Sequence, residues 1–210
     1  MDGNNRWSQK NKVTKFYAYE KGAKNLYKLS NFIFDYYNTN FISAFALSNN
    51  NLNRSTRILK LITQILNKFL DDALQKKNNN FNIEFKGDFN FLESTIKKKI
   101  LTINKTKFTN LNRKLLIFLN YSGKKDIVKA ASSKLITNEN KFRDLLITNN
   151  LTDPEILIRT GGYKRLSDFM LFEISYTELF FLNKLWPDLN KADIVKIIEK
   201  YKKISRNFGK

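Results

Sequence analysis

A stretch near the C-terminal end concentrates residues that could bind an anion. It runs from residue 153 to residue 189 and includes a short apolar segment, Glu155–Arg159, that ends in an arginine. Such a segment is typical of a strand buried on both faces. The two residues Gly161 and Gly162 follow closely, and glycine permits the sharp turn that is expected there.

The residues after this turn predict a phosphate site. Ser167 is a good N-cap for the mostly apolar segment from Asp168 to about Tyr176, which we expect to be a helix. Arg159, Arg165 and the Ser167 hydroxyl then gather between a strand end and a helix start. Free backbone N–H groups and the helix dipole favour a bound anion at that place.

The N-terminal segment offers a second set of polar groups, because Met1–Trp7 reads MDGNNRW. Asp2 supplies a carboxylate, Gly3 a flexible backbone position and Arg6 a guanidinium, all within five residues. A carboxylate there could hold magnesium, while Arg6 and the backbone could hold a diphosphate. The alternative interpretation is a frayed polar terminus.

Both segments resemble motifs of the cis-prenyltransferases, the undecaprenyl diphosphate synthase-like enzymes. The string IRTGG-x-x-R-L-S, followed by Glu178 and LWPD, resembles the C-terminal signature of that family, and MDGNNRW resembles its MDGNGRW motif. Between them, SNNNLNR (Ser48–Arg54) resembles SSENWNR, and NYSG (Asn120–Gly123) resembles part of NYGGRWDI. The motifs occur in the family's order, and the resemblance covers nearly the whole chain.

The resemblance implies that the chain condenses isopentenyl diphosphate onto an allylic diphosphate, such as farnesyl diphosphate, with cis double bonds and with Mg²⁺ as cofactor. It implies Asp2 and Asn51 as catalytic residues, and Asp2 and Glu178 at the metal, with Asp2 also a candidate for steering the proton. For isopentenyl diphosphate it implies Arg159, Arg165 and Ser167. For the allylic diphosphate it implies Gly3, Asn4, Asn5, Arg6, Trp7, Lys15, Tyr19, Ser48 and Arg54.

Several positions depart from the family pattern. Lys15 and Tyr19 stand where the family has an arginine and a histidine, so a bidentate fork and an imidazole are lost. Other departures are Asn5 for glycine, Asn50 for glutamate, Tyr163 for the glutamate of RTGGE, and Asn207-Phe208-Gly209 for Arg-x-Gly. These departures leave product length and primer preference open.

The elements expected between the motifs alternate between strands and helices. Strands are expected at Phe41–Leu47, Asn82–Lys86, Arg113–Leu119 and Glu155–Arg159. Helices are expected at Tyr17–Tyr37, Ser55–Lys77, Phe91–Ile103, Lys125–Ile136, Glu139–Thr148 and Lys191–Arg206, the last capped by Asn190. The pattern predicts one α/β domain over residues 1–210, with a mainly parallel central sheet flanked by helices.

In the family a buried strand precedes the MDGN motif, whereas here Met1 is the first residue. The first family strand is therefore expected to be missing. We expect an empty place beside Phe41–Leu47 or Glu155–Arg159, a weakly held Asp2, and full activity only in a form extended upstream.

Composition narrows the classes of function. The chain has 210 residues, no cysteine and no histidine, which excludes disulfides, thiolate metal sites and histidine chemistry. It suits a reducing cytoplasm, and no apolar run is long enough to cross a bilayer. The net charge of +19 raises a nucleic-acid hypothesis, but an AT-biased genome would give the same Lys- and Asn-rich composition, so no nucleic acid is expected.

Partners and competing functions complete the expectations. The apolar segment Glu178–Pro187 predicts a homodimer, and a lipid product would allow peripheral membrane association. The alternatives are a non-catalytic subunit of the same fold, or a basic nucleic-acid-binding protein. Retention of Asp2, Gly3 and Asn4 argues against the first, because such subunits typically lose these residues.

Overall fold

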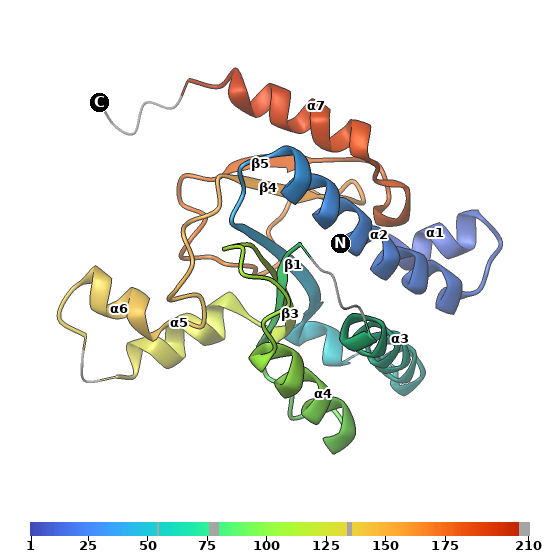
Figure 1. Ribbon diagram of the computed structural model, residues 1–210, viewed down its shortest axis with the longest axis horizontal. Coiled ribbons are helices and arrows are strands. Elements are labelled where there is room, and N and C mark those ends of the chain that lie inside the picture. The colour runs from blue at the N-terminus through green and yellow to red at the C-terminus, as the bar shows by residue number, and fades with distance from the viewer. Residues whose placement is uncertain (54, 76–79, 134–135, 206–210) are drawn as a thin grey trace. The chain divides into compact units, whose positions relative to one another are not determined.

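The computed structural model describes residues 1–53, 55–75, 80–133 and 136–205. The chain divides into two compact units, whose elements are labelled in Figure 1. The first unit contains Met1–Leu29, Asp153–Leu166 and Met170–Lys210, and the second contains Ser30–Thr152 and Ser167–Phe169. The expectation of one domain over residues 1–210 stays a prediction.

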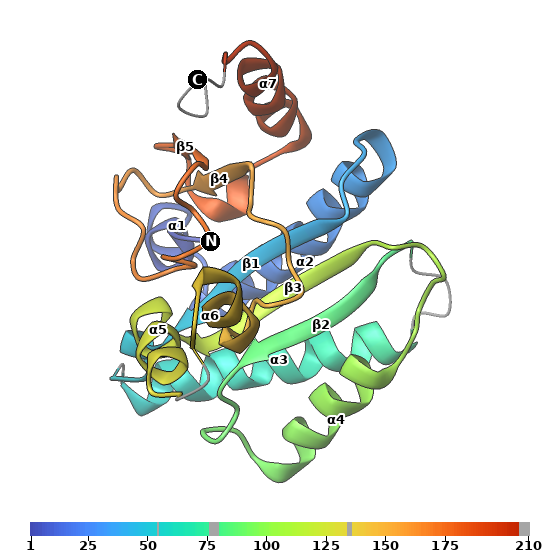
Figure 2. The ribbon, with the colours of Figure 1, turned by 90° about the vertical axis from the view of Figure 1, so that its left-hand side faces the viewer.

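The second unit is built on a three-stranded parallel sheet in the order β1-β3-β2, visible side by side in Figure 2. The strands are β1 (Phe41–Ser48), β2 (Asn82–Gly87) and β3 (Lys114–Tyr121). The central strand β3 is a continuous apolar run that is buried from Leu115 onward, as expected for a strand covered on both faces. Ser48 pairs with Tyr121, so the motifs that follow β1 and β3 leave the sheet at the same edge.

Helices pack on this sheet through apolar faces. The helix α3 (Thr56–Gln75) packs against α4 (Ser94–Lys105), and α4 also contacts β2. The buried side chains on these two helices are Ile65, Leu66, Leu70, Ala73, Ile96, Ile100 and Ile103, at helical spacing. A single-turn helix η1 (Asn49–Asn53) follows β1, and α5 (Gly123–Ala131) and α6 (Glu139–Leu145) follow β3.

The first unit contains a second, two-stranded sheet. Strand β4 (Ile156–Arg159) pairs in parallel with β5 (Glu178–Phe181), which had not been expected from the sequence. The helices of this unit are α1 (Asn4–Lys10), η2 (Trp186–Asp188) and α7 (Lys191–Lys202). Helix α2 (Lys15–Tyr36) contains the boundary between the units.

Most of the expected elements are present, and every paired strand in the described residues is parallel. This confirms the prediction of a parallel α/β fold flanked by helices. The paired strands form two sheets rather than one central sheet. Strand β1 pairs on one edge only, with β3, and β4 pairs on one edge only, with β5, in the part of the chain that the structure describes.

The helix predicted from Asp168 to Tyr176 is wrong, because this segment forms bends and turns. Ser167, Asp168 and Met170 have φ values of 54°, 69° and 46°, whereas residues within a right-handed α-helix have φ of about −63°. Asp168 instead binds polar groups at the start of α5. Its carboxylate accepts hydrogen bonds from the Ser122 hydroxyl at 2.5 Å and from the Lys124 N–H at 2.8 Å. Its carbonyl accepts from the Gly123 N–H at 2.9 Å.

Helix α7 begins with the predicted cap. The Asn190 side chain accepts from the Asp193 N–H, and the Asp193 carboxylate accepts from the Asn190 N–H, which is a capping box. Lys184 donates to both Asp193 oxygens at 2.7 Å. Burial alone would raise the pKa of Asp193, but the Lys184 and Asn190 hydrogen bonds and the nearby lysine charges outweigh it, so the pKa lies below its ordinary value of 3.8.

We expect Asp193→Ala to lower the free energy of unfolding by about 1–2 kcal/mol at pH 7, since it removes the acceptor for the Asn190 N–H in the capping box and the ion-pair partner of Lys184. A folded-state pKa below the unfolded value means that the charged form stabilises fully above pH 3.8 and less as the pH falls through the lowered pKa. Urea unfolding at pH 7 and pH 3 measures this, with the exposed Asp72→Ala as control. An equal loss at both pH values would contradict it.

Candidate active site

The backbone of Asp2 is fixed to the end of strand β4 and to η2. The Asp2 N–H donates to Thr160 Oγ1 at 3.0 Å, and the Thr160 hydroxyl donates to the Asp2 carbonyl at 2.9 Å. The Trp186 N–H donates to the same carbonyl at 3.0 Å. The expectation that Asp2 would be weakly held is therefore wrong, because the hydroxyl of the buried Thr160 bonds both the N–H and the carbonyl of Asp2.

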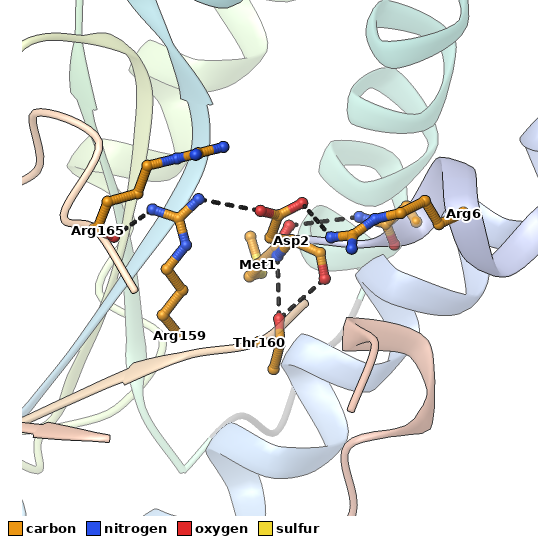
Figure 3. A network of polar contacts seen from close by, with 7 residues as sticks. Met1, Asp2, Arg6, Arg159, Thr160 and Arg165 are labelled. Carbon is orange, nitrogen blue, oxygen red and sulfur yellow. Dashed lines mark hydrogen bonds and ion pairs between the residues drawn. The ribbon is translucent and has the colours of Figure 1, made fainter. Parts of the chain in front are cut away.

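Two arginines lie on either side of the Asp2 carboxylate (Figure 3). Arg159 Nη2 is 3.0 Å from Oδ2, and Arg6 Nη2 is 3.4 Å from Oδ1. Arg159 also donates through Nη1 to the carbonyl of Arg165. Asp2 and Arg6 of the N-terminal motif thus lie beside Arg159, and Arg165 contacts Arg159, all within one compact unit, whereas Ser167 belongs to the other unit.

This cluster carries a net charge of +2, from three guanidinium groups and one carboxylate. The α-amino group of Met1 adds little charge at neutral pH, because burial lowers its pKa to about 6, against the raising effect of Asp2 and with the lowering effect of Arg159. An excess of guanidinium over carboxylate suits a phosphate-bearing ligand, which guanidinium groups bind in bidentate fashion.

The Gly161-Gly162 turn allows this close approach. A Cβ on Gly161, whose φ is 91°, would lie 2.5 Å from Arg6 Nη2 and 3.2 Å from the Asp2 side chain. The N–H groups of the two glycines donate to the carbonyls of Lys184 and Leu182. The predicted cradle of free backbone N–H groups beside a helix start is wrong here, and side chains supply the positive charge instead.

Tyr163 follows the turn directly and faces all three arginines. Its ring centroid lies 4.1 Å from Arg165 Cζ, 4.8 Å from Arg6 Cζ and 6.0 Å from Arg159 Cζ. The sequence marked Tyr163 only as a departure from RTGGE, and it gave no sign of the clamp formed by Thr160. Thr160 and Tyr163 lie one and four positions after Arg159. Their closeness to this motif arginine is the feature of the sequence that could have marked them as site residues.

Helix α1 carries the other N-terminal motif residues. Gly3, with φ 108°, is its N-cap, and a Cβ there would lie 2.8 Å from Leu185 Cδ2. Asn4 and Asn5 begin the helix, and each has a buried side-chain oxygen with no hydrogen-bond partner in the described residues.

Trp7 holds α1 in place. It is buried, its Nε1 donates to Asp188 Oδ1 at 2.7 Å, and Lys21 Nζ lies 4.2 Å from its ring centroid. These contacts favour a positioning role over the direct substrate contact that the resemblance implies.

Trp186, in η2, is hydrogen-bonded to helix α2 within the same unit. Its indole N–H donates to the Gly22 carbonyl at 2.9 Å, and Asn25 Nδ2 donates to the Trp186 carbonyl at 3.1 Å. A Cβ on Gly22 would lie 2.5 Å from Asn4 Oδ1 and 3.0 Å from Trp186 Cδ1. Lys15 and Tyr19 lie one turn apart at the start of α2, the first exposed and the second half-buried.

Three of the remaining predicted site residues, Ser48, Asn51 and Ser167, lie in the second unit. Ser48 ends β1, and Asn51 lies in η1, whose Asn49 Nδ2 donates to Asn120 Oδ1 at 2.7 Å. Ser167 is exposed and has a φ of 54°, and the residues that follow it form bends and turns, so the expected N-cap role is wrong. Arg54 lies outside the described residues.

Glu178 begins β5 and pairs with Ile156, three residues before Arg159. Its backbone therefore lies about 10 Å along the strand from the end of β4 that holds Asp2. No group of three or more acidic residues that could hold a metal ion occurs among residues 1–53, 55–75, 80–133 and 136–205. Also in these ranges, no helix is long and apolar enough to span a membrane.

Comparison with known proteins agrees with this arrangement. The family model described as "Putative undecaprenyl diphosphate synthase" matches residues 1–209. A Pyrobaculum aerophilum tritrans,polycis-undecaprenyl-diphosphate synthase (geranylgeranyl-diphosphate specific) is 32% identical, over 100% of this chain and 93% of that protein. A Micrococcus luteus ditrans,polycis-undecaprenyl-diphosphate synthase ((2E,6E)-farnesyl-diphosphate specific) is 30% identical, over 100% and 88%.

Solved structures are similar as well. Lavandulyl diphosphate synthase from Lavandula x intermedia, in complex with dimethylallyl diphosphate, superposes with a TM-score of 0.91 at 26% identity, over 100% of this chain and 95% of that one. A probable undecaprenyl diphosphate synthase from Campylobacter jejuni gives 0.81 at 29% identity, over 90% and 92%. The chain therefore belongs to the undecaprenyl diphosphate synthase family of cis-prenyltransferases and is a prenyl-transferring enzyme.

Proposed function

We propose that this enzyme condenses isopentenyl diphosphate onto farnesyl diphosphate and extends it with cis double bonds to a polyprenyl diphosphate. The observation that carries the proposal is the shared carboxylate: Asp2 contacts Arg6 through one oxygen and Arg159 through the other. Arg6 belongs to the motif assigned to the allylic diphosphate, and Arg159 to the motif assigned to isopentenyl diphosphate. Two diphosphates bound by these arginines would adjoin each other at Asp2.

Adjacent diphosphates are what the reaction needs. The allylic carbon–oxygen bond breaks, the alkene of isopentenyl diphosphate forms the new carbon–carbon bond, and a proton is lost. Cationic groups near the leaving diphosphate stabilise the charge that develops on it. Arg6, with Gly3, Asn4 and Asn5 on α1, would serve the allylic substrate, and Trp7 would position that helix. Lys15, Tyr19, Ser48 and Arg54 are proposed for the same substrate, and Asn51 is proposed as a catalytic residue together with Asp2.

The second substrate is assigned to the other arginines. Arg159 and Arg165, which are joined through the Arg165 carbonyl, would bind the isopentenyl diphosphate together with Ser167. The farnesyl primer is proposed because the Micrococcus luteus relative is specific for it.

Magnesium is the proposed cofactor, because a carboxylate of the cluster could bind it together with oxygens of the substrate. The Asp2 side chain is 35% exposed and is the acidic group of the cluster. Mg²⁺ is usually held by one or two carboxylates together with substrate phosphates. Asp2 would supply the carboxylate and the diphosphate the remaining oxygens, and the metal would neutralise the leaving group. Glu178 remains a proposed ligand or supporting residue.

A homodimer, a cytoplasmic location and membrane association through the lipid product are also proposed. The outer edge of β5 is unpaired in the described residues, and Leu179 on this strand is 42% exposed. An open strand edge beside apolar side chains is a suitable dimer surface. The absence of cysteine suits a reducing compartment.

Purified protein with magnesium, farnesyl diphosphate and labelled isopentenyl diphosphate tests the whole proposal, with products sized by chromatography. Asp2→Asn should lower kcat by about 100-fold or more, the cost of losing one electrostatic stabiliser of the transition state. Without magnesium, the same variant should bind inorganic diphosphate at least as tightly as the parent, because it raises the charge of the cluster. The control is the exposed Asp72→Asn, and weaker metal-free binding by Asp2→Asn would contradict the proposed role.

Arg159→Ala and Arg165→Ala should each weaken isopentenyl diphosphate binding by about 1.5–3 kcal/mol, the range for hydrogen bonds to charged groups. Binding of the allylic diphosphate should change much less. Titration calorimetry with each substrate measures both effects, and Lys98→Ala removes an exposed cation of α4 as a control. Equal losses for the two substrates would mean that the pockets are wrongly assigned.

Leu179→Lys should convert the dimer to a monomer, because it places a charge on the open edge of β5. Sedimentation at micromolar concentration distinguishes the two states, and Leu101→Lys, at a leucine on α4 that is 53% exposed, is the matched control. A parent protein that is already monomeric at this concentration would refute the proposed dimer.

A further inference from the structure

Tyr163 occupies an unusual place among the arginines. Its ring centroid lies 4.1 Å from Arg165 Cζ and 4.8 Å from Arg6 Cζ, both inside the range of a cation–π interaction, with Arg159 Cζ at the limit at 6.0 Å. The three arginines come from α1, from the end of β4 and from the loop after the Gly161-Gly162 turn. One ring thus contacts guanidinium groups from three separate segments.

Asp2 cannot hold all three cations. It pairs with Arg6 and Arg159, whereas Arg165 has no carboxylate within ion-pair distance among the residues that the structure describes. The Arg165 guanidinium instead lies over the ring of Tyr163. The ring is therefore the group that orients Arg165.

The backbone presents the ring to the arginines. Gly161 and Gly162 have φ values of 91° and 80°, and their N–H groups are bonded to the carbonyls of Lys184 and Leu182. The turn is thus fixed immediately before Tyr163. The missing side chain at Gly161 leaves the space that Arg6 enters.

We propose that Tyr163 is a positioning residue that holds the Arg165 and Arg6 guanidinium groups in place for the diphosphate of the substrate. The inference rests on the proposed function, since it assigns these arginines to diphosphate binding. A neutral ring attracts guanidinium groups through its face and leaves their charge unneutralised. A carboxylate at this position would compete with the diphosphate for the same donors. Tyr163 thereby sets the affinity for isopentenyl diphosphate without touching it.

The test compares variants with and without a ring. Tyr163→Leu removes the ring, and we expect the KM for isopentenyl diphosphate and the dissociation constant of inorganic diphosphate to rise about 2- to 30-fold, the factor that corresponds to lost cation–π contacts. We expect kcat to change less than KM. Tyr163→Phe keeps the ring and should restore the parent values. Tyr36→Leu, at a tyrosine that is 71% exposed, is the control.

A double-mutant cycle with Arg165→Ala identifies the group through which the ring acts. We expect Tyr163→Leu to cost much less in the Arg165→Ala background, because the oriented guanidinium is then absent. Equal costs in both backgrounds, or a Phe variant as weak as the Leu variant, would overturn the inference. Tyr163→Gln is a second ring-free variant in case the Leu variant does not fold.

The outcome also separates the two proposals. If Arg165→Ala weakens diphosphate binding but Tyr163→Leu does not, the positioning role is wrong and the pocket assignment stands. If Arg165→Ala leaves diphosphate binding unchanged, the pocket assignment is wrong, and the positioning role that depends on it is wrong as well.

Discussion

The interaction on which the candidate site depends is the attachment of Asp2 to the end of β4. Thr160 accepts from the N–H of Asp2 and donates to its carbonyl, so residues 158 positions apart in the chain are held at hydrogen-bond distance. The carboxylate then lies between Arg6 and Arg159. Without these two hydrogen bonds, the Asp2 backbone would lose its attachment to the residue that follows β4. The hydrogen bonds of Thr160 therefore bring the N-terminal motif and the motif at the end of β4 together in one charged cluster.

The parts of the fold that depend on local periodicity could be predicted from the sequence. The long helices α2 and α3 and the buried strand β3 follow from their apolar spacing, and α7 from its Asn190 cap. The segment after Ser167 could not, because its serine, aspartate and apolar residues are those of a good helix start. The decisive contacts are the hydrogen bonds that the Asp168 carboxylate accepts from Ser122 and Lys124, which are more than forty positions away in sequence. Strand β5 is only four residues long and needs β4 beside it, so its identity also depends on a tertiary partner.

The candidate site likewise has a part that could be predicted from the sequence and a part that could not. Its charged residues could be predicted, since Asp2, Arg6, Arg159 and Arg165 all stand in motifs of the family. The means by which they are held could not. Sequence reasoning assigned the anion pocket to backbone N–H groups and a helix dipole, whereas the Gly161 and Gly162 N–H groups are bonded to Lys184 and Leu182. Positive charge in this cluster comes from arginine side chains, of which Arg159 pairs with Asp2 and Arg165 lies over the ring of Tyr163.

The two tryptophans of the chain, Trp7 and Trp186, are both buried in the first unit. One is bonded to Asp188 and the other to Gly22, and Lys21 lies over the ring of the first. The second unit contains no tryptophan at all, since the chain has two. Intrinsic tryptophan emission is therefore an optical reporter of the first unit alone. Loosening of α1 would appear in the spectrum even while the three-stranded sheet stayed intact.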